Sequence, residues 1–369
     1  MKYPLPRSEI ELIRTWVVAG ARNDAGKPPF ADSRHKIYAT NQGSDKVSVI
    51  DADAMVVSRI IDVDATAAID SPHNVHIDRQ GRFGYVTLIN SGLLVQFDAA
   101  TDSVVATAPA GRSPAHPITS PDGGTVYVTN WDQLQPSLRV LDTATMTEKF
   151  VIYFPPSLGG QPHGIAITGS GRTIYTANTY GQSIFKIEIG ESADDTRLTY
   201  IPLGDPGQRL DPLQVMLDGD ESHVFVTCNF SGEVRVVDTA LDQMVEVIPI
   251  GGRVASQGRS PDGREIYVAN WERNGIDVVD TREMRVVASL RNDGLATPVF
   301  AHPHAAAFSG DGRYVFVTNE NTNGAYPQHH PTEGGGRNGN VAVIDAATRQ
   351  VVKVLEVEVF PTGIAFLGR

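Results

Sequence analysis

Tyr127-Val128-Thr129-Asn130 is the stretch that decides the fold, because close copies of it return along the whole chain. Each copy has an aromatic residue, two small or β-branched residues and, in most cases, Asn. The copies begin at Tyr38, Tyr85, Tyr127, Tyr175, Phe225, Tyr267 and Phe316. Successive copies lie 42 to 50 residues apart. A period of about 40–50 residues with several short strands per unit is typical of β-propeller blades.

The repeat around Tyr175 shows the predicted order of strands within one blade. An apolar run at 164–167 predicts a first, buried strand. Residues 173–178, 183–189 and 198–203 are then expected as the second, third and fourth strands. In other repeats the turn between the first two strands reads Ser-Pro-Asp-Gly, which suits a type I turn.

The two ends of the chain complement each other. The first copy, at Tyr38, has no first strand ahead of it, whereas residues 362–366 form an unmatched first strand at the C-terminus. We expect the C-terminus to supply the innermost strand of the first blade, which closes the ring and removes two open sheet edges. The sequence therefore predicts an all-β, seven-bladed β-propeller over residues 35–369, with a short N-terminal helix and linker at 1–34.

Composition limits the possible partners and cofactors. The chain has 369 residues and a net charge of −12, which argues against nucleic acid as a partner, because phosphate binding needs clustered Lys and Arg. Its single cysteine, Cys228, excludes an internal disulfide or a Cys-based metal site. No stretch approaches the ~18 apolar residues of a membrane span. No secretory signal stands at the start of the sequence.

Three histidines occupy one equivalent position in the repeat. Twelve residues before each aromatic lies the start of the innermost strand, where the residues are His73, Ala115, His163, Leu213, Ala255 and His304, with Thr362 serving the first blade. Each of these histidines follows Pro, which restricts the backbone and can hold the next side chain in a set direction. We expect the three imidazoles to converge at the channel mouth, where they suit Cu, Zn or Fe. Alternatively, they only bind backbone carbonyls.

Further histidines extend this candidate metal site. The equivalent position at the start of each innermost strand is called the ring position below. His116 lies one residue past the ring position of its repeat, and we consider it a possible ligand or a structural histidine. The longest predicted loop, 320–340, carries His329, His330 and a run of three glycines at 334–336. It belongs to the same blade as His304 and is predicted to lie on the same face. We expect a lid or extra ligands there, with an ordinary surface loop as the alternative.

Three other residues are candidates for binding a cofactor or ligand. Arg259 lies in a predicted inner strand, where a charge is costly unless it is paired or faces channel water, so it is a candidate for an anionic group. Trp131 and Trp271 follow second strands and can wall a planar ligand on the histidine face. Asp132, Glu272 and Glu320 are acid–base candidates by location alone.

The Tyr-Val-Thr-Asn repeats and Ser-Pro-Asp-Gly turns resemble the YVTN family of seven-bladed propellers. Related propellers include those of nitrous oxide reductase, cytochrome cd1 nitrite reductase, lactonases and binding modules without chemistry. Pro162-His163-Gly164 is similar to the Pro-His-Gly segments that supply copper ligands in nitrous oxide reductase. That resemblance implies a metal or a haem-type cofactor, although the ring offers too few histidines for a four-copper cluster.

Residues 1–24 do not fit the repeat and predict a helix that begins after Ser8 and ends at Gly20. This segment resembles the last helix of a c-type cytochrome domain, although no Cys-x-x-Cys-His motif is present. The resemblance implies a cytochrome–propeller fusion or a c-type cytochrome partner. It also implies an exported, periplasmic or extracellular protein.

The expected function is therefore that of an extracytoplasmic redox protein. It would hold a metal or metallocofactor at the channel mouth and act on a small-molecule substrate or an electron-transfer partner. Two alternatives remain open. The chain is a non-enzymatic propeller that binds a protein or small ligand on its top face, or a lactonase- or lyase-like enzyme whose ring histidines act as acid–base groups.

Overall fold

The computed structural model describes residues 5–18, 21–205, 207–330, 332 and 336–368. The chain divides into two compact units, Met1–Arg34 and His35–Arg369. The first unit contains helix α1 (Arg7–Val18), in which the backbone N–H groups of Glu9 and Ile10 donate to the carbonyl of Pro6. Gly20, the predicted end of this helix, lies outside the described residues. The cytochrome resemblance of this segment stays a prediction.

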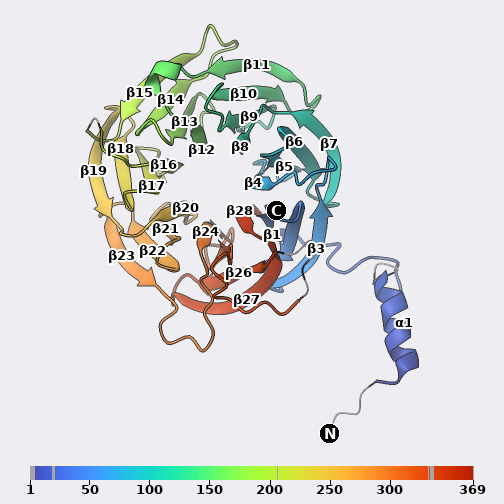
Figure 1. Ribbon diagram of the computed structural model, residues 1–369. Coiled ribbons are helices and arrows are strands. Elements are labelled where there is room, and N and C mark those ends of the chain that lie inside the picture. The colour runs from blue at the N-terminus through green and yellow to red at the C-terminus, as the bar shows by residue number, and fades with distance from the viewer. Residues whose placement is uncertain (1–4, 19–20, 206, 331, 333–335, 369) are drawn as a thin grey trace. The chain divides into compact units, whose positions relative to one another are not determined.

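Seven four-stranded antiparallel sheets follow one another around a ring in the second unit (Figure 1). The sheet of the first blade has the order β28-β1-β2-β3, so the last strand of the chain is its innermost strand. Tyr38 on β1 pairs with Ala365 on β28. The seven-bladed fold and its closure by the C-terminus are thus confirmed. Among the described helices, none is long and apolar enough to cross a membrane.

Each blade contributes one strand to each of four concentric layers. The innermost strands are β28 (Pro361–Gly368), β4 (Pro72–Ile77), β8 (Pro114–Thr119), β12 (Pro162–Ile167), β16 (Pro212–Leu217), β20 (Val254–Arg259) and β24 (Pro303–Phe308). The second strands, which carry the repeat motif, are β1 (His35–Asn41), β5 (Phe83–Leu88), β9 (Thr125–Asn130), β13 (Thr173–Asn178), β17 (His223–Cys228), β21 (Glu265–Asn270) and β25 (Tyr314–Asn319).

Two further layers lie outside these strands, and the outermost strands form the rim in Figure 1. The third strands are β2 (Lys46–Asp51), β6 (Leu93–Asp98), β10 (Ser137–Asp142), β14 (Ser183–Glu188), β18 (Glu233–Asp238), β22 (Gly275–Asp280) and β26 (Asn338–Asp345). The outer strands are β3 (Val56–Asp62), β7 (Ser103–Pro109), β11 (Glu148–Tyr153), β15 (Arg197–Pro202), β19 (Gln243–Pro249), β23 (Arg285–Leu290) and β27 (Gln350–Val359). A short 3-10 helix, Pro156–Leu158, follows β11.

The repeat motif is apolar because both faces of a second strand are buried between neighbouring blades. Successive side chains of a strand point to opposite faces. Tyr38 is fully buried, and its ring packs 4.9 Å from that of Phe97 in the next blade. Its hydroxyl donates to Asp102, which also pairs with the buried Lys36. The aromatic position therefore joins blades as well as filling the core.

The Thr of the motif positions the inner strand of the next blade. Oγ1 of Thr129 donates to the backbone carbonyl of His163 at 2.6 Å, and Oγ1 of Thr87 donates to that of Ala115 at 2.6 Å. Thr40 makes the same bond to the carbonyl of His73 at 3.1 Å. These acceptors all occupy the ring position, so the motif that forms the fold also fixes the backbone beneath the histidines.

Candidate metal centre

Every inner strand begins with an irregularity that affects where its side chains point. Six of the seven start at Pro, and β20 starts at Val254. In each blade the pairing register between the inner and second strands shifts near this start, for instance between Pro162 and Ile165 and between Pro114 and Pro117. Such bulges are common beside functional sites because they re-aim side chains.

The residues directly before four of these prolines have a left-handed backbone. Ser71 and Phe360 have a φ of 57°, and Asp211 and His302 have a φ of 52°. This conformation is uncommon for non-glycine residues, and it costs of order 1–3 kcal/mol unless the surroundings enforce it. It precedes the segments of His73 and His304 but also those of Leu213 and Thr362, so it belongs to the entry of the inner strands rather than to the histidines alone.

His73 on β4 and His163 on β12 meet in the channel. Both side chains are buried, at 8% and 6% exposure. Their ring centroids lie 5.1 Å apart with the planes at 77°, and their Nε2 atoms are 3.1 Å apart. The structure therefore brings these two histidines together, as the sequence predicted.

The second nitrogen of each ring faces an oxygen acceptor. Nδ1 of His163 lies 3.1 Å from the backbone carbonyl of Leu213, which can only accept, so Nδ1 carries the ring proton. Nδ1 of His73 lies 3.2 Å from Oε1 of Gln42, which assigns its proton in the same way. With the Gln42 amide in this orientation, both Nε2 atoms present lone pairs, and they face each other 3.1 Å apart.

Gly164 makes the bond from His163 to Leu213 possible. A Cβ atom at this position would lie 2.7 Å from the carbonyl oxygen of Leu213 and 2.6 Å from Cα of Gln214. Only glycine lets β12 and β16 approach this closely. Packing thus explains why glycine follows histidine in the Pro-His-Gly segment. The close approach that glycine allows also sets the orientation of the histidine ring.

His116 on β8 completes a compact group of three histidines. Its ring centroid lies 4.6 Å from that of His163 and 5.5 Å from that of His73. Ligand nitrogens of His73, His116 and His163 all lie within 4.8 Å of one another. His116 thus joins the group although it lies one step past the ring position.

His304 lies beside this group but outside it. Its ring centroid is 6.2 Å from that of His73, and its Nδ1 lies 2.7 Å from Oε1 of Glu320. Oε2 of the same carboxylate accepts the indole N–H of Trp271 at 2.9 Å. The trio expected from the ring positions therefore differs by one member, with His116 in the group and His304 adjacent to it.

Burial keeps these imidazoles neutral. It lowers the pKa of His73 and of His116 well below the usual value, and charge repulsion from neighbouring histidines adds to the effect. Burial also lowers the pKa of His163 to about 4. Neutral imidazole is the form that ligates metal ions, so the three side chains are ready as ligands at neutral pH.

The two predicted tryptophans lie close to the histidines. The ring of Trp131 is 5.7 Å from that of His163, and its Nε1 is buried without a hydrogen-bond partner among the described residues. It stacks loosely on Tyr180 at 6.5 Å. Trp271 stacks on His302 at 3.8 Å while its N–H is held by Glu320.

The other predicted residues lie away from the group. Arg259, at the end of β20, lines the central channel, and its guanidinium donates to the backbone carbonyls of Leu217 and Asp218. His329 and His330 are exposed, and their backbone N–H groups donate to Glu356 on the outer strand β27. Two of the three glycines of this loop, 334 and 335, lie outside the described residues.

One position was overlooked in the sequence. The residue four places after each aromatic lies beside the ring position, and three of these residues contact ring histidines: Gln42 with His73, Trp131 with His163 and Glu320 with His304. Trp131 and Glu320 were noticed for other reasons, whereas Gln42 was not. The repeat itself contains the signal, since this offset is constant from blade to blade.

The donor set fits a single first-row transition ion. Nitrogens bound at about 2.0–2.1 Å to one tetrahedral ion stand about 3.3 Å apart, close to the observed separation of the two Nε2 atoms. Ligating histidines usually donate their other N–H to a carbonyl or carboxylate, as His163 does to Leu213. Among the described residues the facing lone pairs have no partner other than each other, and a cation between them supplies one.

Comparisons with known proteins agree with the architecture. No family model matches the chain. The seven-bladed beta-propeller protein Rv1057 of Mycobacterium tuberculosis is 22% identical over 315 residues, which cover 76% of each chain. The chain is a seven-bladed β-propeller. The propeller is also 25% identical over 194 residues to the uncharacterized protein YncE of Salmonella typhi, and it spans about half the length of that relative.

Solved structures share the same fold. A functionally unknown protein from Desulfotomaculum acetoxidans has a TM-score of 0.68 at 16% identity, covering 90% of this chain and 99% of that one. The Kuenenia stuttgartiensis hydrazine synthase has a TM-score of 0.65 at 18% identity, covering 85% and 92%. The dihydro-heme d1 dehydrogenase NirN has a TM-score of 0.62 at 15% identity, covering 94% and 79%. These similarities concern the fold alone.

Proposed function

We propose that the propeller binds one transition-metal ion through His73, His116 and His163 and is an extracytoplasmic redox protein. The observation that carries this proposal is the pair of facing Nε2 lone pairs, 3.1 Å apart, with a third imidazole in reach. Copper and iron fit both the donors and the redox role. Zinc fits the same donors but supports the lactonase- or lyase-like alternative instead.

The surroundings favour the less charged state of the ion. Three neutral imidazoles do not compensate a metal charge, and burial makes an uncompensated charge costly. When bound, the ion would therefore supply electron-accepting chemistry at a raised reduction potential. The carboxylate of Glu320 contacts His304, whose ring lies beside that of His73.

The chain's own residues have separate tasks in this proposal. Gln42 and the carbonyl of Leu213 hold the rings of His73 and His163 with Nε2 directed inward. The His304–Glu320 pair holds a proton beside the group and can pass it to a bound molecule. Trp131 covers the side of His163, where its unpartnered indole N–H offers a donor to a ligand.

A single ion is favoured over a haem-type cofactor. The three ring centroids lie 4.6 to 5.5 Å apart, so the lone pairs converge on a space suited to one ion. NirN, by name a dihydro-heme d1 dehydrogenase, supports a redox role on this fold in another protein. The proposed electron partner of this propeller is a c-type cytochrome, as the helix at its N-terminus suggests.

Metal analysis tests the proposal. Protein purified without a His-tag would be stripped of metal, reconstituted separately with Cu, Zn or Fe, desalted and measured by elemental analysis. We expect about one equivalent of Cu or Fe in the parent and none in the His73→Ala/His163→Ala double variant. His223→Ala is the matched control, because His223 pairs with Asp218 in a different blade, and it should retain the metal.

Spectroscopy separates the alternatives. A copper or iron form that is reduced and reoxidised reversibly would support the redox role, whereas binding of zinc alone would favour the hydrolytic or lyase alternative. An intense visible band after purification would identify a haem-type cofactor. Absence of stoichiometric metal from the parent would overturn the proposal and leave a binding module without chemistry as the better description.

A further inference from the structure

A cavity of about 560 Å³ occupies the central channel. Its lining includes residues from all seven inner strands, among them Ile118 of β8, Val215 of β16 and Phe366 of β28. These residues lie further along their strands than the ring position, so the cavity is at the other end of the channel from the three histidines. The volume falls in the range of small-molecule binding sites.

Two arginines from different blades line this cavity. Arg259 ends β20, and Arg79 follows β4. Among the residues that the structure describes, neither guanidinium forms an ion pair, and Arg259 donates only to the backbone carbonyls of Leu217 and Asp218. Burial lowers the pKa of Arg259, the negative charges of Asp218 and Glu221 oppose this shift, and the positive charge of Arg79 adds to it. Two positive charges thus line one cavity, and no carboxylate of the described residues forms an ion pair with either of them.

The acidic groups nearby are engaged elsewhere. Glu221 also lines the cavity, but its Oε1 accepts the backbone N–H of Gly169. The carboxylate of Asp218 accepts from Ser222 and lies 2.9 Å from Nδ1 of His223. An anion in the cavity would therefore meet the arginines without displacing an existing ion pair.

Apolar and polar side chains share the remaining walls. Ile165, Ile167, Met216 and Phe308 contribute aliphatic and aromatic surface, whereas His76, Gln214 and Ser309 contribute polar groups. A small inorganic anion would leave the apolar surface in contact with water, whereas an apolar body would cover it. The cavity thus combines a cationic end with an apolar stem, formed by these four apolar residues, within a lining of mixed polarity.

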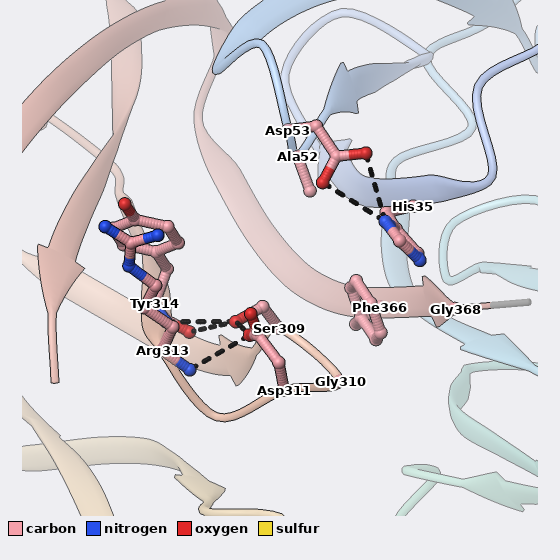
Figure 2. A pocket seen from close by; sticks show the side chains of 10 residues that line it. All are labelled: His35, Ala52, Asp53, Ser309, Gly310, Asp311, Arg313, Tyr314, Phe366 and Gly368. Carbon is pink, nitrogen blue, oxygen red and sulfur yellow. Dashed lines mark hydrogen bonds and ion pairs between the residues drawn. The ribbon is translucent and has the colours of Figure 1, made fainter.

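A second cavity, between the first and last blades, lacks this combination. Figure 2 shows its charged side chains beside their partners: His35 lies 3.0 Å from Asp53, and Arg313 lies beside Tyr314. The guanidinium carbon of Arg313 is 4.9 Å from the centre of the Tyr314 ring. This cavity of about 450 Å³ offers no comparable pair of unpaired cations on an apolar stem.

We infer that the channel cavity is a binding site for an amphipathic organic anion. A carboxylate or phosphate head would bind Arg259 and Arg79, and an apolar body would lie against Ile165, Met216 and Phe308. Arginine favours such heads because its planar fork can donate two parallel hydrogen bonds. The site does not depend on the metal proposed at the other end of the channel.

Calorimetric titration with benzoate and phenyl phosphate tests this inference, with benzamide as the uncharged probe of similar shape. We expect saturable binding of the two anions and at least about tenfold weaker binding of benzamide. Arg259→Leu should weaken anion binding about tenfold or more, and Leu is tolerated because Leu217 occupies the equivalent position. Arg79→Gln should weaken it less, since Arg79 is the more exposed of the two.

Controls keep the result interpretable. Arg172→Gln, in an exposed turn of another blade, should bind as the parent does. Arg259→Lys retains a charge and should recover part of the affinity that Arg259→Leu loses. The His73→Ala/His163→Ala variant should bind anions normally, which separates this site from the metal centre. Equal binding of benzamide and benzoate, or unchanged binding in a folded Arg259→Leu protein, would overturn the inference.

Discussion

Nε2 of His73 and Nε2 of His163 lie 3.1 Å apart while the ring protons of both residues sit on Nδ1. Two lone pairs at this distance repel each other in the metal-free protein. This repulsion does not separate the rings, because Gln42 and the carbonyl of Leu213 hold them by hydrogen bonds to Nδ1. Thr40 and Thr129 also fix the backbone of the two histidines. A cation between the two nitrogens turns the repulsion into ligation.

Gln42→Leu should separate metal affinity from stability. Without the Oε1 acceptor, the proton of His73 can move to Nε2 and donate to His163, which relieves the repulsion. We expect metal affinity to fall about 10–100-fold, with the free energy of unfolding of the metal-free protein unchanged or higher. Competition titration and urea unfolding measure the two quantities. Gln80→Leu, at an exposed position, is the control, and equal affinity in both variants would refute the assigned tautomer.

Gly164→Ala should damage the site through the backbone. Its Cβ would clash with Leu213 and Gln214, so β12 and β16 must move apart and the bond from His163 to Leu213 must lengthen. We expect a loss of about 1–3 kcal/mol in unfolding free energy, the usual cost of overpacking, together with weaker metal binding. At Gly124, the nearest atom to an added Cβ is 3.5 Å away, so Gly124→Ala should be nearly neutral. Similar effects at both positions would contradict the packing argument.

The metal-free protein should lose stability as the pH falls from about 6.5 to 4. Burial lowers the pKa of His163 and of His76 to about 4, so the unfolded chain takes up protons in this window that the folded protein does not. Each residue then contributes a loss of at most about 3 kcal/mol, complete once the pH is below the folded pKa. Urea unfolding at several pH values measures the slope. A His76→Gln variant should show a shallower slope, and an identical slope would count against this assignment.

Deleting residues 360–369 should abolish cooperative unfolding. These residues contain all of β28, whose absence leaves β1 as an unpaired inner edge and opens the ring. Open edges promote pairing with other chains, so we also expect association. Calorimetry and light scattering measure both effects. A truncated monomer with the parent's melting transition would show that closure is not required.

The repeat period was sufficient to predict the blades, their closure and the shared position of His73, His163 and His304. These features follow from strand alternation and a constant offset, both of which are visible in a single sequence. The exchange of His304 for His116 was not predictable in that way, because it depends on how rings from different blades approach one another across the channel. Gln42 was missed because its role depends on a contact between two blades.

The channel arginines illustrate the same limit. Arg259 stood out in the sequence because a charge interrupts an apolar strand. Arg79 follows its strand in an ordinary turn, and only the ring geometry brings it to the same cavity. The repeat period predicts where a residue lies along its own strand. Which residues of different blades line the same cavity is known only from the structure.

Anomalous diffraction from crystals of the copper- or iron-loaded protein tests the central claim most directly. Data collected on either side of the metal's absorption edge locate the ion without assumptions about its ligands. We predict one strong peak within bonding distance of Nε2 of His73, Nε2 of His163 and a ring nitrogen of His116. Absence of a peak between these rings in a crystal whose protein contains stoichiometric metal would contradict the account.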